Sequence, residues 1–88
     1  MSYSIQFTSS AAKSLTKLPA SAAQRISAVI DTLGAKPRPQ GCKKLSGQDN
    51  LYRVRAGDYR IVYQIQDKQL VVLIVRIGHR RDIYRDMD

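Results

Sequence analysis

Hydrophobic and polar residues alternate in three stretches of the chain, and this alternation predicts strands. Residues 3–7 (YSIQF), 51–55 (LYRVR) and 59–66 (YRIVYQIQ) follow a period of two, as expected when one face of a strand is buried. Residues 69–77 (QLVVLIVRI) are apolar on both faces, which is typical of a central strand. The tripeptide AGD predicts a hairpin turn between the second and third stretches, and DK indicates a weaker turn before the fourth.

Between the first two of these strands the period changes to that of a helix. Apolar residues spaced by four and three positions predict a first helix: Ala11, Leu15 and Leu18. Ser9 or Ser10 is expected to cap its start, because a serine oxygen accepts from the free amides of the first turn. Pro19 is expected to end this helix or to open the next one.

A second helix is predicted from apolar residues that share one face at a period of 3.6: Ala22, Ile26, Val29, Ile30 and Leu33. Ser21 and Gln24 have the spacing of a capping box, and Gly34 stands where a left-handed C-terminal cap is expected. The predicted order is therefore β-α-α-β-β-β. It indicates an α+β fold in which a helical hairpin packs on one face of a largely antiparallel four-stranded sheet.

Residues 35–50 (AKPRPQGCKKLSGQDN) are predicted to form one long irregular loop. Four residues of this loop oppose regular structure: Pro37, Pro39, Gly41 and Gly47. Its lysines make it a basic arm, and loops of this length in compact domains are usually functional or mobile.

Length and composition limit the class of protein. Residues 1–88 are predicted to be a single domain, and 43% apolar with 25% charged residues indicates a globular one. The longest apolar run, residues 70–75, is far shorter than the roughly 20 residues of a membrane helix. The N-terminus lacks a signal-peptide pattern, so we expect a cytoplasmic protein that does not bind membranes. Cys42 and His79 are the only residues of their kinds, so we expect no disulfide, no metal and no cofactor.

The charge of the chain indicates a polyanionic partner. The formal net charge is +8, and residues 36–60 carry seven cations against two carboxylates, a local charge of +5. Such a surface favours nucleic acid first. Two alternatives stay open: a basic surface that keeps the protein soluble, and one that docks an acidic protein.

Three arginines are expected on one face of the predicted sheet. If Tyr52 and Val54 face the helices, strand alternation directs Arg53 and Arg55 to the other face. Arg60 lies across the short hairpin from Arg55 and can join them. Guanidinium groups gathered on a rigid sheet suit the binding of an anion, and a merely solvated charged face is the alternative.

The segments YRVRAGDYRIVY and GHRRDIYR together resemble the RelE/ParE superfamily of toxins from toxin–antitoxin systems, and most of all its RelE branch. The resemblance extends over essentially the whole chain. It implies a ribosome-dependent endoribonuclease that cuts mRNA in the decoding site, and a cognate antitoxin protein in a hetero-oligomeric complex. The partners it implies are therefore the antitoxin, the ribosome and mRNA.

Carried over by position, the family's catalytic residues fall on Arg53, Arg55, Arg60, Arg80 and Tyr84. The first two positions are often lysine in the family, and arginine does not readily release a proton. We therefore do not expect a general base at either position. Further residues are expected to bind RNA: Lys43, Lys44, His79 and Arg81.

The general base remains open at this stage. RNA cleavage needs a base for the 2′-hydroxyl and positive charge for the developing phosphorane. The chain contains no Glu and a single His. Tyr84 is the first candidate, because neighbouring arginines favour the phenolate form of a tyrosine. His79 is the second candidate, and a third possibility is that Tyr84 only packs against the sheet.

Two other functions are compatible with the sequence. A ParE-like toxin of the same fold would inhibit DNA gyrase without being an enzyme, and its relatives generally lack the full set of five catalytic positions. A small basic RNA-binding module without catalysis is the other alternative. Gly78 is expected to turn the chain after the last strand, so that Tyr84 reaches the phosphate held by the arginines.

Overall fold

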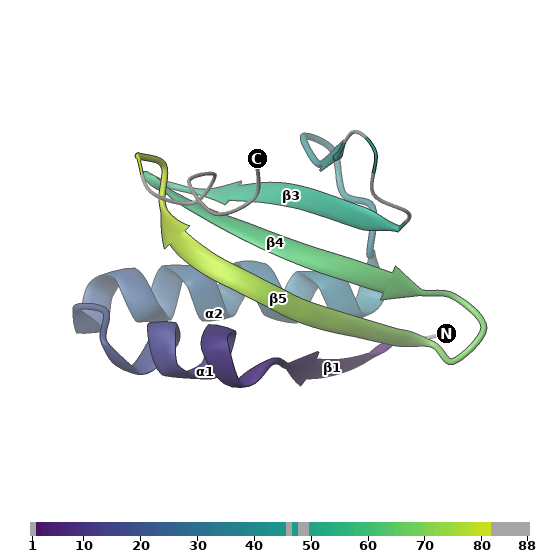
Figure 1. The fold of residues 1–88 in the computed structure, drawn as a ribbon, viewed down its shortest axis with the longest axis horizontal. Coiled ribbons are helices and arrows are strands. Elements are labelled where there is room, and N and C mark those ends of the chain that lie inside the picture. Colours follow the sequence, from purple (N-terminus) through teal and green to yellow (C-terminus); the bar gives the residue numbers. More distant parts are fainter. Residues whose placement is uncertain (1, 46, 48–49, 82–88) are drawn as a thin grey trace.

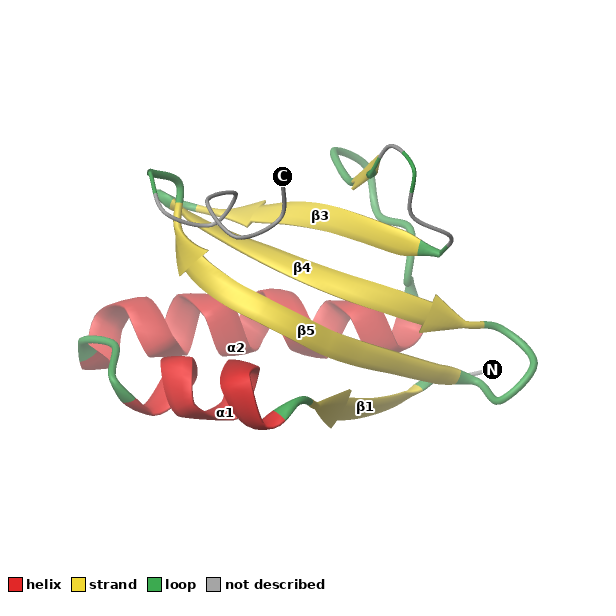
Figure 2. Cartoon of the chain, in the orientation of Figure 1, coloured by secondary structure: helices red, strands yellow, loops and turns green. Residues whose placement is uncertain are grey.

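The computed structural model describes residues 2–45, 47 and 50–81. In chain order its elements are β1 (Ser4–Phe7), α1 (Ser9–Thr16), α2 (Ala20–Ala35), β2 (Lys43–Lys44), β3 (Leu51–Ala56), β4 (Tyr59–Gln66) and β5 (Val71–His79). Both helices lie on one face of the sheet, as the sequence predicts (Figures 1 and 2). No described helix is long and apolar enough to cross a membrane.

The strands form one mixed sheet in the order β1-β5-β4-β3-β2. β1 runs parallel to β5, and the other neighbouring pairs are antiparallel. β5 has strands on both sides and is therefore a central strand, as predicted. Its helix-side residues Val72, Ile74 and Ile77 are buried, and its other residues are half-buried. The α+β fold and the largely antiparallel sheet are thus confirmed, but the sheet has five strands where the sequence predicts four.

The additional strand β2 lies inside the segment that the sequence predicts to be irregular. Lys43 pairs with Arg53 and Lys44 pairs with Tyr52. The prolines and glycines that oppose regular structure come before and after these two lysines, which are themselves able to pair with the edge of β3. Short edge strands that carry lysine are common, because they discourage further strand addition.

Thr8, and not Ser9 or Ser10, caps α1. Its hydroxyl oxygen accepts from the Ala11 amide at 3.1 Å, while the serines fall in the first turn of the helix. The same hydroxyl donates to the Val75 carbonyl at 2.9 Å, and the Thr8 amide donates to Ile74. Position 8 is therefore fixed by its pairing with β5, and the cap follows from that.

The ends of α2 also differ from the prediction. Pro19 is the residue before its first turn and makes no side-chain cap, so Ser21 and Gln24 do not form a capping box. Gly34 lies inside the helix and is buried, with no left-handed conformation. Its carbonyl accepts from the Tyr3 amide at 2.8 Å, and a Cβ at Gly34 would lie 3.3 Å from the Tyr3 carbonyl oxygen. Gly34 thus allows the chain entering β1 to approach α2 closely.

A bulge in β5 changes which side chains face the helices. Tyr63 pairs with Ile74, but the preceding Val62 pairs with Arg76, so Val75 has no partner in β4. Ile74 and Ile77 consequently both point toward the helices although they are three residues apart. β5 then continues to His79, with Gly78 paired to Arg60. The expected turn at Gly78 is therefore wrong, and the chain turns at residues 80–81.

The core lies between the helices and the sheet. Its fully buried members of largest volume on this side are Ile26, Leu33, Ile61, Tyr63, Ile65 and Ile74. The apolar faces predicted for both helices are confirmed: Ala11 and Ile30 are buried, and Leu15 and Leu18 pack against the cluster. This core fixes the alternation of the strands and therefore decides which residues reach the opposite face of the sheet.

Candidate functional site

The face of the sheet opposite the helices, here called the open face, carries two rows of basic residues. Tyr52 and Val54 pack toward the helices, so Arg53 and Arg55 point to the open face, as predicted. The pairing of the strands gives a first row of Lys43, Arg53, Val62 and Arg76. A second row, nearer the β3–β4 turn, consists of Arg55, Arg60 and Gly78.

Arg60 is held by the hairpin that carries it. Its Nη1 donates to the Gly57 carbonyl at 3.2 Å and to the Tyr59 carbonyl at 3.0 Å. The turn itself is tight, since Ala56 pairs with Tyr59 and Gly57 adopts a φ of 63°. Two carbonyl acceptors thus hold the guanidinium of Arg60 at the hairpin, in the row of Arg55.

Val62 provides an apolar floor between the arginines of the first row. It is fully buried although it does not belong to the core on the helix side. Its partners across the sheet are Arg53 on β3 and Arg76 on β5. Val62 therefore separates the two arginines of this row on neighbouring strands.

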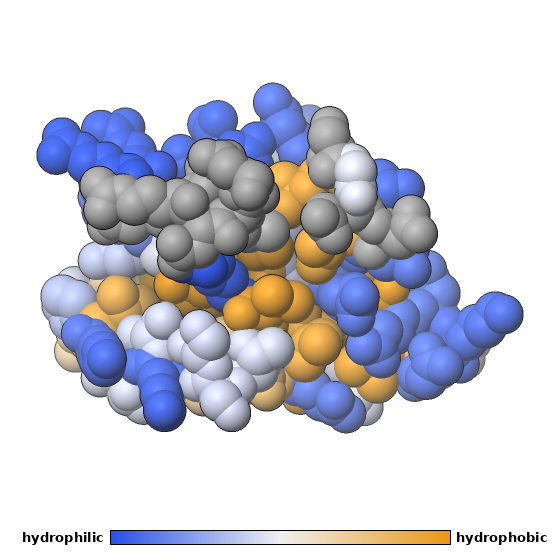
Figure 3. Space-filling model, in the orientation of Figure 1, coloured by the Kyte–Doolittle hydropathy of each residue, from blue (hydrophilic) through white to orange (hydrophobic). Residues whose placement is uncertain are grey.

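The electrostatic character of this face comes from the strands themselves. None of the five strands in the described structure contains Asp or Glu. Figure 3, which views the molecule in the orientation of Figure 1, shows hydrophilic residues at both ends, by the β3–β4 turn and by the β4–β5 turn, and apolar ones along the middle. Such a surface is suited to bind phosphate groups and to stabilise negative charge that develops on them.

The turn after β5 brings Arg80 and Arg81 to the same end of the molecule. The Arg80 amide donates to the Asp58 carbonyl of the β3–β4 turn at 2.9 Å. Both arginines are exposed. Arg80 therefore lies beside the hairpin that carries Arg55 and Arg60, whereas the predicted base, Tyr84, lies outside the described residues.

His79 and Lys44 point to the helix side of the sheet. His79 follows the core residue Ile77 by two positions and pairs with Tyr59. The two rings meet edge to face, with centroids 5.7 Å apart and an interplanar angle of 81°. Lys44 pairs with Tyr52, which also packs toward the helices. Of the residues predicted to bind RNA, Lys43 points to the open face with Arg53, and Arg81 is exposed in the turn after β5.

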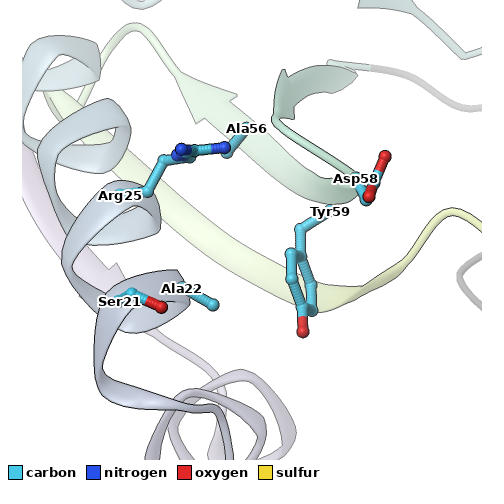
Figure 4. Close-up of a pocket in the computed structure, with 6 residues that line it drawn as sticks. All are labelled: Ser21, Ala22, Arg25, Ala56, Asp58 and Tyr59. Carbon is cyan, nitrogen blue, oxygen red and sulfur yellow. The ribbon is translucent and has the colours of Figure 1, made fainter.

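A pocket of about 170 Å³ lies on the helix side and not on the open face. Figure 4 shows its lining from α2 and from the β3–β4 hairpin: Ser21, Ala22, Arg25, Ala56, Asp58 and Tyr59. The guanidinium of Arg25 approaches the turn so closely that a Cβ at Gly57 would lie 2.6 Å from its Nη1. The pocket contains none of the predicted catalytic residues, so the candidate site remains the open face.

Sequence reasoning counted Arg38 among the cations of the basic region, but the structure pairs it. Its Nη2 lies 2.9 Å from the Asp67 Oδ2, and its Nε donates to the Tyr52 hydroxyl at 3.2 Å. The Tyr3 hydroxyl donates to the same carboxylate at 2.7 Å. Hydrogen bonds from Arg38 and Tyr3 lower the pKa of Asp67, while the bond to Asp67 raises the pKa of Tyr3. This network holds the loop after α2 and leaves the anion-binding role to other residues.

Tyr63 closes the same end of the core. Its hydroxyl donates to the Pro37 carbonyl at 2.7 Å, and its ring stacks with that of Tyr52 at a centroid distance of 6.0 Å. Burial raises the pKa of the Tyr63 hydroxyl well above its ordinary value. Tyr63 therefore stays protonated and serves the structure.

Arg76 is the residue of the open face that sequence reasoning missed. Simple alternation from Val72 and Ile74 directs Arg76 into the core, and only the bulge at Val75 reverses its direction. An arginine in an otherwise apolar strand was the available signal, because a charged side chain is rarely buried without a partner.

Comparisons with known proteins agree with this architecture. Residues 5–84 match the family described as ParE toxin of type II toxin-antitoxin system, parDE. Toxin RelG of Mycobacterium tuberculosis is 34% identical over 89 residues, covering 97% of this chain and 99% of RelG. The mRNA interferase toxin RelE of Escherichia coli is 29% identical, covering 91% of this chain and 85% of that protein. A chain of the archaeal RelE–RelB complex from Pyrococcus horikoshii superposes with a TM-score of 0.81 at 31% identity, covering 93% of this chain and 99% of that one. The chain therefore belongs to the RelE/ParE superfamily, the toxins of toxin–antitoxin systems.

Proposed function

We propose that this toxin is a metal-independent endoribonuclease that cuts mRNA on the ribosome and so inhibits translation. The observation that carries the proposal is the open face, where Arg53, Arg55 and Arg60 come together from strands that contain no carboxylate. The similarity to the Escherichia coli mRNA interferase toxin supports the reaction. A rigid group of guanidinium ions is suited to bind a phosphodiester, and a flexible chain holds such a group less well.

In the proposed reaction the 2′-hydroxyl of one nucleotide attacks the adjacent phosphorus. The base removes the proton of that hydroxyl, the bond to the next 5′-oxygen breaks, and the leaving oxygen takes up a proton. The products are a cyclic phosphate and a free 5′-hydroxyl. Arg53 and Arg55 hold the phosphate, and Arg60 and Arg80 stabilise the charge that develops on it, because charge-assisted hydrogen bonds strengthen as the charge grows.

Tyr84 is the proposed base. The pairing of His79 with Tyr59 favours this assignment, since it directs the imidazole to the helix side, away from Arg53 and Arg55. The expected result is that Tyr84→Phe slows ribosome-dependent cleavage by about 100-fold or more, the usual worth of a general base, while ribosome binding survives. His79→Gln is expected to have a much smaller effect. The reverse order of the two effects assigns the base to His79.

The antitoxin partner is proposed from the similarity to a chain of an archaeal RelE–RelB complex. We expect an acidic, partly apolar segment that wraps this domain, because the toxin presents both cations and apolar residues on its surface. Coexpression with the neighbouring open reading frame tests this expectation. A purified pair that modest salt alone dissociates would contradict the wrapping model, because burial of apolar surface resists salt.

The decisive experiment is primer extension on an mRNA incubated with the toxin, with and without ribosomes. Cuts that appear only with ribosomes support the proposed function. The family matched by residues 5–84 carries the name ParE, so a DNA gyrase supercoiling assay is run in parallel. Blocked supercoiling without mRNA cuts would replace the endoribonuclease with a ParE-like inhibitor. An Arg60→Ala, Arg80→Ala variant is the negative control for cleavage.

A further inference from the structure

Arg76 has a position in the sheet that the proposed catalytic set does not use. It pairs with Val62, which pairs on its other side with Arg53, so both arginines flank the same apolar residue on the open face. Paired residues of neighbouring strands direct their side chains to the same face. With strands about 4.8 Å apart, the two arginine backbones are separated by roughly 10 Å, the width of two strand spacings.

This separation suits a nucleic-acid backbone. Two long arginine side chains at that spacing can converge on one phosphate or contact two neighbouring ones, and each guanidinium offers a planar pair of donors.

Arg76 lies outside the row of residues next to the β3–β4 turn. Arg55 and Arg60 form the row next to the β3–β4 turn, and Arg80 contacts that turn through its amide. Arg76 lies one row further along the sheet, opposite Val62.

We propose that Arg76 is an RNA-positioning residue that binds an mRNA phosphate next to the scissile one, across Val62 from Arg53, which holds the scissile phosphate. The inference rests on the proposed endoribonuclease function and adds to it a contact that binds substrate without taking part in the chemical step. A residue of this kind affects the KM for the substrate more than kcat, whereas a residue that stabilises the transition state lowers kcat.

The test compares Arg76→Gln with Arg76→Lys and with Lys13→Gln, which removes the charge of an exposed lysine of α1 on the helix side. Cleavage of mRNA-programmed ribosomes gives KM and kcat for each variant. Binding of a short single-stranded RNA with one 2′-deoxy nucleotide at the cut site is measured over a range of salt concentrations. Circular dichroism melting identifies any variant that fails to fold.

For Arg76→Gln we expect KM to rise about tenfold, the worth of one charged hydrogen-bonding contact, with kcat changed much less. The slope of log K against log salt should become less negative by about 0.7, the value for one phosphate of a single strand. Arg76→Lys should keep the slope and recover part of KM, because it keeps the charge but loses the planar fork. Lys13→Gln should match the wild type in both measurements.

Three outcomes overturn the inference. One is a folded Arg76→Gln protein with unchanged KM and salt slope. Another is a lowered melting temperature with normal kinetics, which makes Arg76 a structural residue. The third is a raised KM with an unchanged slope on the short RNA, which assigns Arg76 to the ribosome. If the wild type cuts no mRNA at all, the proposed function fails, and the binding slopes alone then decide whether Arg76 contacts RNA.

Discussion

Thr8 shows how one side chain can serve two elements at once. Its hydroxyl accepts from the first turn of α1 and donates to the carbonyl of Val75, the unpaired residue of the β5 bulge. A hydroxyl can donate and accept at the same time, because it carries one donor and two acceptor lone pairs. The residue therefore connects the start of a helix to the irregular point of a strand far away in the sequence.

Thr8→Ala is expected to destabilise the protein by about 1–2 kcal/mol, the range for loss of an N-cap with a second hydrogen bond. Thr8→Ser should lose much less, because it keeps the hydroxyl. Ser9→Ala and Ser10→Ala serve as controls and should change the unfolding free energy little, since both residues lie within the first turn. Urea denaturation measures all four variants. A larger loss at either serine than at Thr8 would contradict the capping assignment.

At the scale of residues, the sequence predicts those whose environment follows from a simple period. The outward direction of Arg53 and Arg55 follows from alternation with Tyr52 and Val54 and was predicted correctly. The roles of Thr8 and Gly34 were not predictable, because each depends on a partner that only the fold brings near: the Val75 carbonyl and the Tyr3 backbone.

At the scale of elements, the β3–β4 hairpin is the part of the fold that combines most functions. It places Arg55 opposite Arg60, holds Arg60 through two turn carbonyls, and receives the turn after β5 through the Asp58 carbonyl. On its helix side Arg25 packs against the turn residue Gly57. The geometry of this two-residue turn therefore sets the geometry of the proposed catalytic end.

Gly57→Ala is expected to cost about 1–2 kcal/mol of unfolding free energy, because an alanine at a φ of 63° is in the left-handed region. Gly57→Asn should cost less, since asparagine tolerates this conformation. Both variants add the same Cβ next to the flexible end of Arg25, so contact with Arg25 does not distinguish them. Thermal melts test the order. Equal losses in the two variants would make the contact, and not the backbone, the cause.

Elements with a strong pattern were predicted well, and their ends were not. The range of β4, Tyr59–Gln66, was predicted in full, since its alternation is regular and a clear turn precedes it. β2 was not predicted, because two lysines show no periodic pattern. They form a strand only by pairing with β3. β5 extends past Gly78 because pairing with Arg60 and Tyr59 continues there. In that case tertiary pairing overrides the usual role of glycine.

At the scale of the whole molecule, one polar network joins segments distant in the sequence. Asp67 in the β4–β5 turn receives hydrogen bonds from Tyr3 near the N-terminus and from Arg38 in the loop after α2. Arg38 also lies over the Tyr52 ring, 5.3 Å from its centroid. Three chain segments are therefore held at the end of the sheet opposite the β3–β4 hairpin.

The network predicts a dependence of stability on pH. The pKa of Asp67 is lowered in the folded state, so its contribution is present above the ordinary carboxyl value of about 4 and is lost as the pH falls through the lowered value. Asp67→Asn should therefore lower the melting temperature at neutral pH and flatten its fall below about pH 4. Asp31→Asn, on the exposed side of α2, is the control. If the melting temperatures of Asp67→Asn and of the wild type fall equally with pH, the network does not cause the pH dependence of stability.

The distribution of charge predicts how RNA binding responds to salt. Replacing Arg53 and Arg55 by alanine should make the slope of log K against log salt less negative by about 1.4, or 0.7 for each phosphate contact with a single strand. Replacing Lys13 and Lys17 of the α1 region, on the opposite side of the sheet, should leave the slope unchanged. Filter binding to single-stranded RNA measures both double variants. Equal slopes would mean that RNA is attracted by net charge alone.

The unpaired Val75 has a consequence for how relatives of this chain are compared. After the bulge, each side chain points to the face opposite to the one that simple alternation predicts. Arg76 therefore reaches the open face, and Ile77 reaches the core. Deleting one residue here would move the side chains that follow it to the opposite face of the sheet, without changing their identity. Insertions and deletions at this point can therefore change the chemistry of the sheet more than substitutions do. An alignment that misplaces a single gap near position 75 compares residues that lie on opposite sides of the molecule.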